Sequence, residues 1–100
     1  MVVESSGNIF ADIGVPNPEE ALAKVKLMRL IATVIERRGM TQTDAAKRLG
    51  IAQSDVSNIV RGRGRVYSMD RLLQLLHDLG AGITIEAKIG SKKERIPLFA

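Results

Sequence analysis

The chain has 100 residues, 45% of them hydrophobic and 26% charged, which predicts one globular domain with a modest core. It has no cysteine, which excludes disulfides and thiolate sites, and no apolar run approaches the roughly 18 residues that cross a membrane. The N-terminal MVVESSGNIF is acidic, unlike a secretory signal, so we expect a cytoplasmic protein without a membrane partner. The net charge is +4, and residues 37–71 include eight basic residues but only three acidic ones. Such a region is either a basic solvated surface or a binding surface for a polyanion.

Residues 1–16 show no sustained hydrophobic period and are expected to form an N-terminal arm. Helix-start signals follow: Asn17 as a side-chain cap, Pro18 at the first helical position and Glu20 completing a capping box. An apolar stripe then recurs at helical spacing, comprising Leu22, Val25, Met28, Ala32 and Ile35. Arg37-Arg38-Gly39 predicts the end of this helix.

Two short helices are predicted next. Thr41 caps the first, with Asp44 completing a capping box, and Gly50 ends it. Its small apolar face is formed by Ala45, Ala46 and Leu49. Only residues 50–52 separate it from the second helix, Gln53 to Val60, whose inward positions are Val56, Ile59 and Val60. This spacing predicts a helix-turn-helix over about residues 41–61.

The chain continues with RGRGR, a helix and a strand. Ser68 is expected to cap a leucine-rich helix that Gly80 ends, which completes a helical domain over residues 17–80. From Gly82 the hydrophobic period becomes two, which predicts a strand with one apolar face made of Ile83, Ile85, Ala87 and Ile89. Residues 96–99 form either a short return strand, which Pro97 disfavours, or a tail. The fold class is therefore mainly α, with about four helices and a C-terminal β-strand.

Several residues of the predicted helix pair form a pattern that resembles a known family. They are Gln42 after Thr41, Ala46, Gly50-Ile51, Gln53-Ser54-x-Val56-Ser57-x-Ile59 and Gly62. This pattern resembles the helix-turn-helix of the Cro/C1-type (Xre) transcriptional regulators. With the leader NIFADIGVPNPEEALAK, residues 8–90 are also similar to a subgroup that includes HigA-type antitoxins. The resemblance implies a lambda-repressor-like fold that binds a double-stranded DNA operator, and in the antitoxin subgroup a toxin protein as well.

The polar positions of the second short helix are candidate DNA contacts. With the inward positions assigned to the core, the outward side chains Gln53, Ser54, Ser57 and Asn58 can reach base edges in a major groove. Phosphate contacts are expected from Thr41, Gln42, Arg61, Arg63 and Arg65, with Gln42 implied by the resemblance. The alternatives are a solvated helix face, and a flexible arginine loop or nonspecific RNA-binding tract. Asp55 would repel phosphate, so we expect it to cap its helix because Ala52 is a poor cap.

One histidine and no cysteine leave no catalytic constellation, so we expect no enzyme activity and no cofactor or metal. His77 is interpreted as a packing or surface residue. The region 81–100 is expected to hold a dimerisation strand and a tail, because a lone strand is unstable in water. Pairing with a second copy through residues 83–89 is favoured over a hairpin with residues 95–99. The predicted function is a dimeric repressor that reads a DNA operator; the alternatives are a toxin-binding antitoxin and a protein-interaction module that has lost DNA binding.

Overall fold

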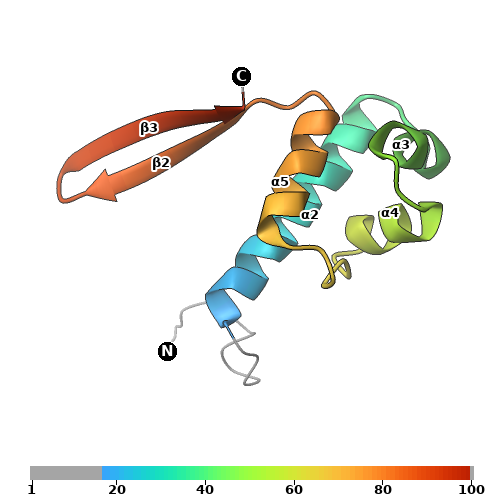
Figure 1. The fold of residues 1–100 in the computed structure, drawn as a ribbon, viewed down its shortest axis with the longest axis horizontal. Helices are drawn as coiled ribbons and strands as arrows, with labels where there is room; N and C mark the ends of the chain where they lie inside the picture. Colours follow the sequence, from blue (N-terminus) through green and yellow to red (C-terminus); the bar gives the residue numbers. More distant parts are fainter. Residues whose placement is uncertain (1–16, 100) are drawn as a thin grey trace.

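The computed structural model describes residues 17–99 and contains four helices followed by a two-stranded sheet (Figure 1). In chain order the elements are α2 (Pro18–Arg37), α3 (Gln42–Leu49), α4 (Gln53–Val60), α5 (Met69–Asp78), β2 (Ile83–Ile89) and β3 (Lys92–Phe99). The mainly helical fold expected from the sequence is confirmed. The predicted arm of residues 1–16 lies outside the described residues. Within the described part, no helix is both long and apolar enough to cross a membrane.

The hydrophobic core lies where α2 and α5 pack together and α3 and α4 close one side (Figure 1). Its largest fully buried side chains are Met28, Ile31, Ile59, Leu72, Leu75, Leu79 and Val56. The apolar stripe predicted for the first helix omitted Ile31, which is only 1% exposed. Because α2 packs against both α4 and α5, its buried face is wider than one helical stripe.

The start of α2 differs from the sequence-based prediction. Asn17 occupies the cap position, but its side chain makes no capping hydrogen bond, and the predicted capping box with Glu20 is therefore wrong. The backbone of Asn17 is left-handed, with φ of 51°, whereas a capping side chain reaches the first turn from an extended backbone. Pro18 does begin the helix, as its fixed φ and missing N–H favour.

The C-terminal strand is half of a hairpin. β2 pairs antiparallel with β3 of the same chain, from Ile89 opposite Lys92 to Ile83 opposite Phe99, with an irregularity between Ile83 and Thr84. The chain thus forms the intrachain hairpin, which the sequence analysis left open but ranked below pairing with a second copy, because β3 begins at Lys92 and supplies the pairing strand. Pro97 is tolerated since β3 is an edge strand. The hairpin extends from the helices on the side of α2 and α5 opposite to α3 and α4 (Figure 1).

Candidate nucleic-acid interface

The first short helix, α3, begins with the predicted capping box. The backbone N–H of Thr41 donates to Oδ2 of Asp44 at 3.2 Å, and the N–H of Asp44 donates to Oγ1 of Thr41 at 3.0 Å. The hydrogen bond from the Thr41 backbone to the carboxylate, followed by one from the Thr41 side chain, holds the pKa of Asp44 below its ordinary value. Gln42, partly exposed, is the first residue of the helix. The Thr41 amide is therefore engaged within the capping box.

The turn between α3 and α4 depends on Gly50. This residue has a left-handed backbone with φ of 69°, which a side chain would strain, and the following Ile51 N–H donates to the carbonyl of Ala46 at 3.1 Å. Ala45 is completely buried, and its small side chain lets the two helices approach closely. The turn therefore fixes the direction in which α4 leaves α3.

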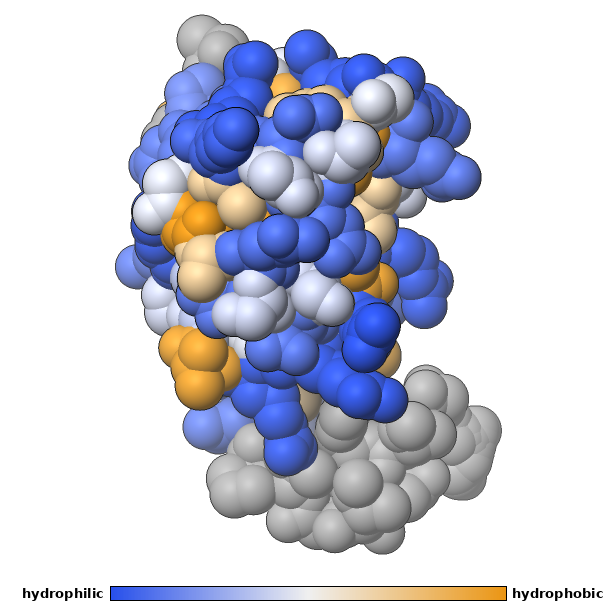
Figure 2. Space-filling view, turned by 90° about the vertical axis from the view of Figure 1, so that its right-hand side faces the viewer, coloured by the Kyte–Doolittle hydropathy of each residue, from blue (hydrophilic) through white to orange (hydrophobic). Residues whose placement is uncertain are grey.

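The second short helix, α4, has the buried apolar face and the outward polar face that the sequence predicted. Val56 and Ile59 are each 1% exposed and anchor it in the core. The predicted base-contacting side chains lie on its other faces: Gln53, Ser54 and Asn58 are exposed and Ser57 is half-buried. The structure thus brings these four polar side chains together on one short helix. The face of the molecule that carries α3 and α4 is mostly hydrophilic, with only scattered apolar residues (Figure 2).

Asp55 differs from its prediction. No side chain caps α4, and Oδ2 of Asp55 instead accepts a hydrogen bond of 3.1 Å from the Tyr67 hydroxyl. Desolvation by burial, followed by this hydrogen bond and the Asp55 charge, raises the pKa of Tyr67. The first turn of α4 is therefore tied to the segment that enters α5.

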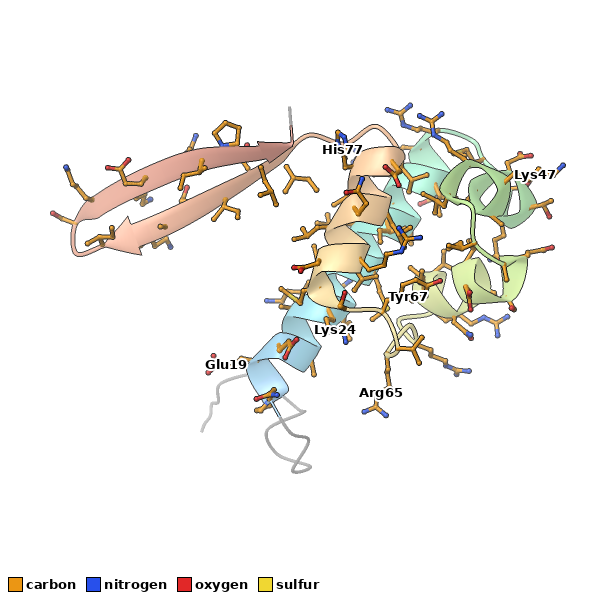
Figure 3. All side chains as sticks on the ribbon, viewed as in Figure 1. Glu19, Lys24, Lys47, Arg65, Tyr67 and His77 are labelled. Atoms are coloured by element: carbon orange, nitrogen blue, oxygen red, sulfur yellow. The ribbon has the colours of Figure 1, made fainter. Side chains whose placement is uncertain are left out.

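The segment 61–68, which we call the arginine connector, joins α4 to α5 and is anchored at two further points. Gly64 is buried, and its N–H donates to Sδ of Met28 at 3.1 Å. The Lys24 ammonium donates to the carbonyl oxygen of Arg65 at 3.0 Å. The side chain of Arg65 points away from the helices (Figure 3). Arg61, Arg63 and Arg65 are all exposed, so their charges project from a backbone with fixed contacts.

Lys24, Gly64 and Tyr67 were missed as supporting residues by sequence reasoning. Their contacts join positions 41, 36 and 12 residues apart, respectively, so no local spacing signals them. The buried position 64 requires glycine for a steric reason, because a Cβ there would lie 2.9 Å from Cγ1 of Ile59.

Part of the central positive charge has a structural partner. Nε of Arg48 donates to the carbonyl oxygen of Asp78 at 3.0 Å, and the Arg38 guanidinium lies directly over Gly80. Both cations are thus close to the C-terminal end of α5, where a positive charge is favourable. Two of the basic residues of the central region therefore lie at the end of α5, whereas Arg61, Arg63 and Arg65 are exposed directly after α4. Among residues 17–99, no group of acidic or histidine side chains is arranged to hold a metal ion.

The family comparison agrees with this geometry. A family model described as a helix-turn-helix domain matches residues 9–88, which include all four helices and most of β2. No match was found among curated proteins or among solved structures. Since the matched region covers most of the chain, the protein belongs to the helix-turn-helix domain family.

Proposed function

We propose that the protein is a DNA-binding transcriptional regulator that represses by occupying an operator. In this proposal α4 enters the major groove and reads base edges with Gln53, Ser54, Ser57 and Asn58. The observation that carries the proposal is the division of α4 into two faces, with Val56 and Ile59 buried while Gln53, Ser54 and Asn58 are exposed. Amide side chains of this kind can form paired hydrogen bonds with adenine.

The arginine connector is the proposed phosphate clamp. Arg61, Arg63 and Arg65 follow α4 directly and are exposed, and Thr41 and Gln42 at the start of α3 supply further donors. Contacts of this kind fix the position of a protein on the duplex without reading its sequence. The anchors at Gly64 and Arg65 support this role, because a fixed backbone loses less entropy when its side chains bind.

A homodimer is part of the proposal, with Ile85, Ala87 and Ile89 as the dimerisation residues. Ile83, which the sequence places on the same face, is instead buried in the helical core. One helix-turn-helix covers one half-site, and two copies meet half-sites about 34 Å apart. The strand β2 lies on the far side of the helical body from α4, so a second copy can bind there without covering the proposed reading face (Figure 1).

The resemblance of residues 8–90 to the Xre family and its HigA-type antitoxins adds a second candidate function, the neutralisation of a toxin protein. An exposed apolar patch of this kind is typical of a surface that binds another protein, and on the hairpin it consists of Ile85, Ile89, Ile96 and Leu98. A neighbouring gene for a small, basic, ribonuclease-like protein would support this function. Failure of the neighbouring product to copurify with the chain would contradict it.

The proposed DNA reading is tested with an operator selected by the purified protein from random duplexes. Replacing Gln53 and Asn58 together with alanine is expected to reduce discrimination between operator and random DNA by about tenfold or more, since each paired base contact contributes about 1–3 kcal/mol. Replacing Arg63 and Arg65 with alanine is expected to weaken both complexes alike and to reduce the salt slope by about 1.8.

The matched control is the double replacement of Lys92 and Lys93, two exposed cations at the far end of the hairpin. It removes the same charge as the arginine pair and is expected to leave the salt slope nearly unchanged. If the glutamine–asparagine pair and the arginine pair change specificity in the same way, the division into reading and clamping residues is wrong. If no duplex binds more tightly than random DNA, operator recognition is wrong as well.

A further inference from the structure

The hairpin has two unequal edges. In the described part of the chain the sheet contains only β2 and β3, so the outer edge of each strand has no paired strand. β3 carries Lys92, Lys93 and Arg95 as well as Pro97, which lacks a backbone donor. Positive charges and proline discourage strand addition. β2 has no proline and mixes one Glu with one Lys, so it is the edge suited to pairing.

The hairpin also has an apolar face that the helices leave largely uncovered. Ile85 and Ile96 lie opposite one another and are 46% and 58% exposed, and Ile89 is 67% exposed. An isolated two-stranded hairpin is at best marginally stable in water, and an independently stable sheet needs three or more strands with an apolar face, or packing against a helix. Both the free edge and the apolar face therefore favour a larger sheet.

The charges on the polar face of the hairpin favour one way of adding strands to the sheet. Within the chain Glu86 pairs with Arg95, with Nε and Oε1 3.3 Å apart, whereas Lys88 lies opposite the like-charged Lys93. An acidic side chain on the open side of Lys88 would offset this repulsion. In a second copy of this chain, Glu86 of the same strand can supply that acidic side chain.

We propose that two copies join through their β2 edges, antiparallel, about a two-fold axis that passes at Ala87. This register places Glu86 of each copy opposite Lys88 of the other, and Ile85 opposite Ile89. An axis at Glu86 or at Lys88 would set identical charges directly opposite one another, which is destabilising. An axis at Ile85 would place Glu86 opposite Thr84, and no residue of the second copy's β2 would lie opposite Lys88.

The result is a four-stranded sheet in the order β3, β2, β2 and β3. A two-fold axis perpendicular to the sheet keeps the isoleucines of both copies on the same face. Ile83 of that face belongs to the helical core, so the two helical bodies lie on the same side of the sheet. The inference rests on the homodimer of the proposed function and specifies its contact. The dimer contact is measured without DNA. Its failure would therefore not affect the proposed reading role of α4, which is tested separately by DNA binding.

The test uses reversed charges and sedimentation velocity of the full chain. Glu86→Lys and Lys88→Glu each convert two attractive contacts to repulsive ones and are each expected to weaken the dimer by about tenfold. An equimolar mixture of the two variants restores opposite charges at both contacts and is expected to regain the wild-type dissociation constant within about threefold. Lys88→Glu also places an acid opposite Lys93, so it preserves the hairpin itself.

The matched control is Lys92→Glu, a reversal of equal size on β3 that is expected to change dimer affinity less than about twofold. The register is tested separately by Ala87→Cys, because the chain has no other cysteine. The axis brings the two introduced thiols directly opposite one another, within the Cα separation that a disulfide needs, so oxidation is expected to crosslink the copies. Glu86→Cys is expected to crosslink far less. A monomeric wild type, a mixture no tighter than its components, or equal crosslinking at both positions would each overturn the proposal.

Discussion

The Tyr67 hydroxyl donates a 3.1 Å hydrogen bond to Asp55, and this contact joins the end of the arginine connector to the first turn of α4. Asp55 is the acidic residue of that turn, beside the exposed Gln53 and Ser54. The bond therefore couples the orientation of the proposed reading helix to the position of the proposed phosphate clamp. Four predictions follow from this and from neighbouring contacts.

Tyr67→Phe is expected to lower the free energy of unfolding by about 1 kcal/mol, the usual net value of a hydrogen bond. It is also expected to weaken operator binding, because α4 and the connector are no longer held together. Urea denaturation and DNA titration measure the two effects. In an Asp55→Ala background the same change should have little further effect on stability; a full additional loss would show that the ring, rather than this bond, is responsible.

The raised pKa of Tyr67 predicts a loss of stability at alkaline pH. The folded chain holds the phenolic proton more tightly than the unfolded chain, so the stabilisation is complete below the unfolded pKa of about 10. It is lost as the pH rises through the higher folded value. Since Tyr67 is the only tyrosine and the chain has no tryptophan, its ionisation can be followed by ultraviolet absorbance. A midpoint at or below the ordinary value would contradict the prediction.

The capping box of α3 predicts a stability loss for Thr41→Ala of about 1 kcal/mol. Thr43→Ala is the control, because Thr43 is exposed in the same turn and does not occupy the cap. The lowered pKa of Asp44 means that its contribution is complete above the ordinary value of 3.8 and is lost as the pH falls through the lower folded value. Thermal unfolding of Asp44→Asn and wild type should therefore converge in acid. Equal losses for the two threonine variants would show that the cap is not responsible.

Gly64→Ala is expected to destabilise the protein by about 1–3 kcal/mol through overpacking. The added Cβ would lie 2.9 Å from Cγ1 of Ile59 and 3.0 Å from Sδ of Met28. Gly62→Asn is the control in the same connector: its site is open, and asparagine tolerates the left-handed backbone there. Chemical denaturation and DNA titration should show losses for Gly64→Ala alone. Similar stability for the two variants would mean that the connector moves freely to accommodate the methyl group.

The sequence predicted much of the fold because its signals are local. Alternating apolar positions, the Thr41 and Ser68 caps and the helix-ending glycines each act within one or two helical turns, and α4 and β2 begin and end where they were expected. Asn17 shows the limit of such signals. The same residue type that caps a helix from an extended backbone also tolerates a left-handed one, and the sequence does not distinguish the two.

By itself the sequence determined that the chain makes short helices with a polar outward face at Gln53 and Asn58, because helical periodicity separates buried from exposed positions. Only the tertiary structure decided which charges are held by internal contacts and which project from the connector. Arg48 bonds the end of α5, Lys24 holds the Arg65 carbonyl, and Asp55 binds Tyr67. Each of these bonds joins residues that are distant along the chain and meet only when the helices pack, so no local pattern encodes them.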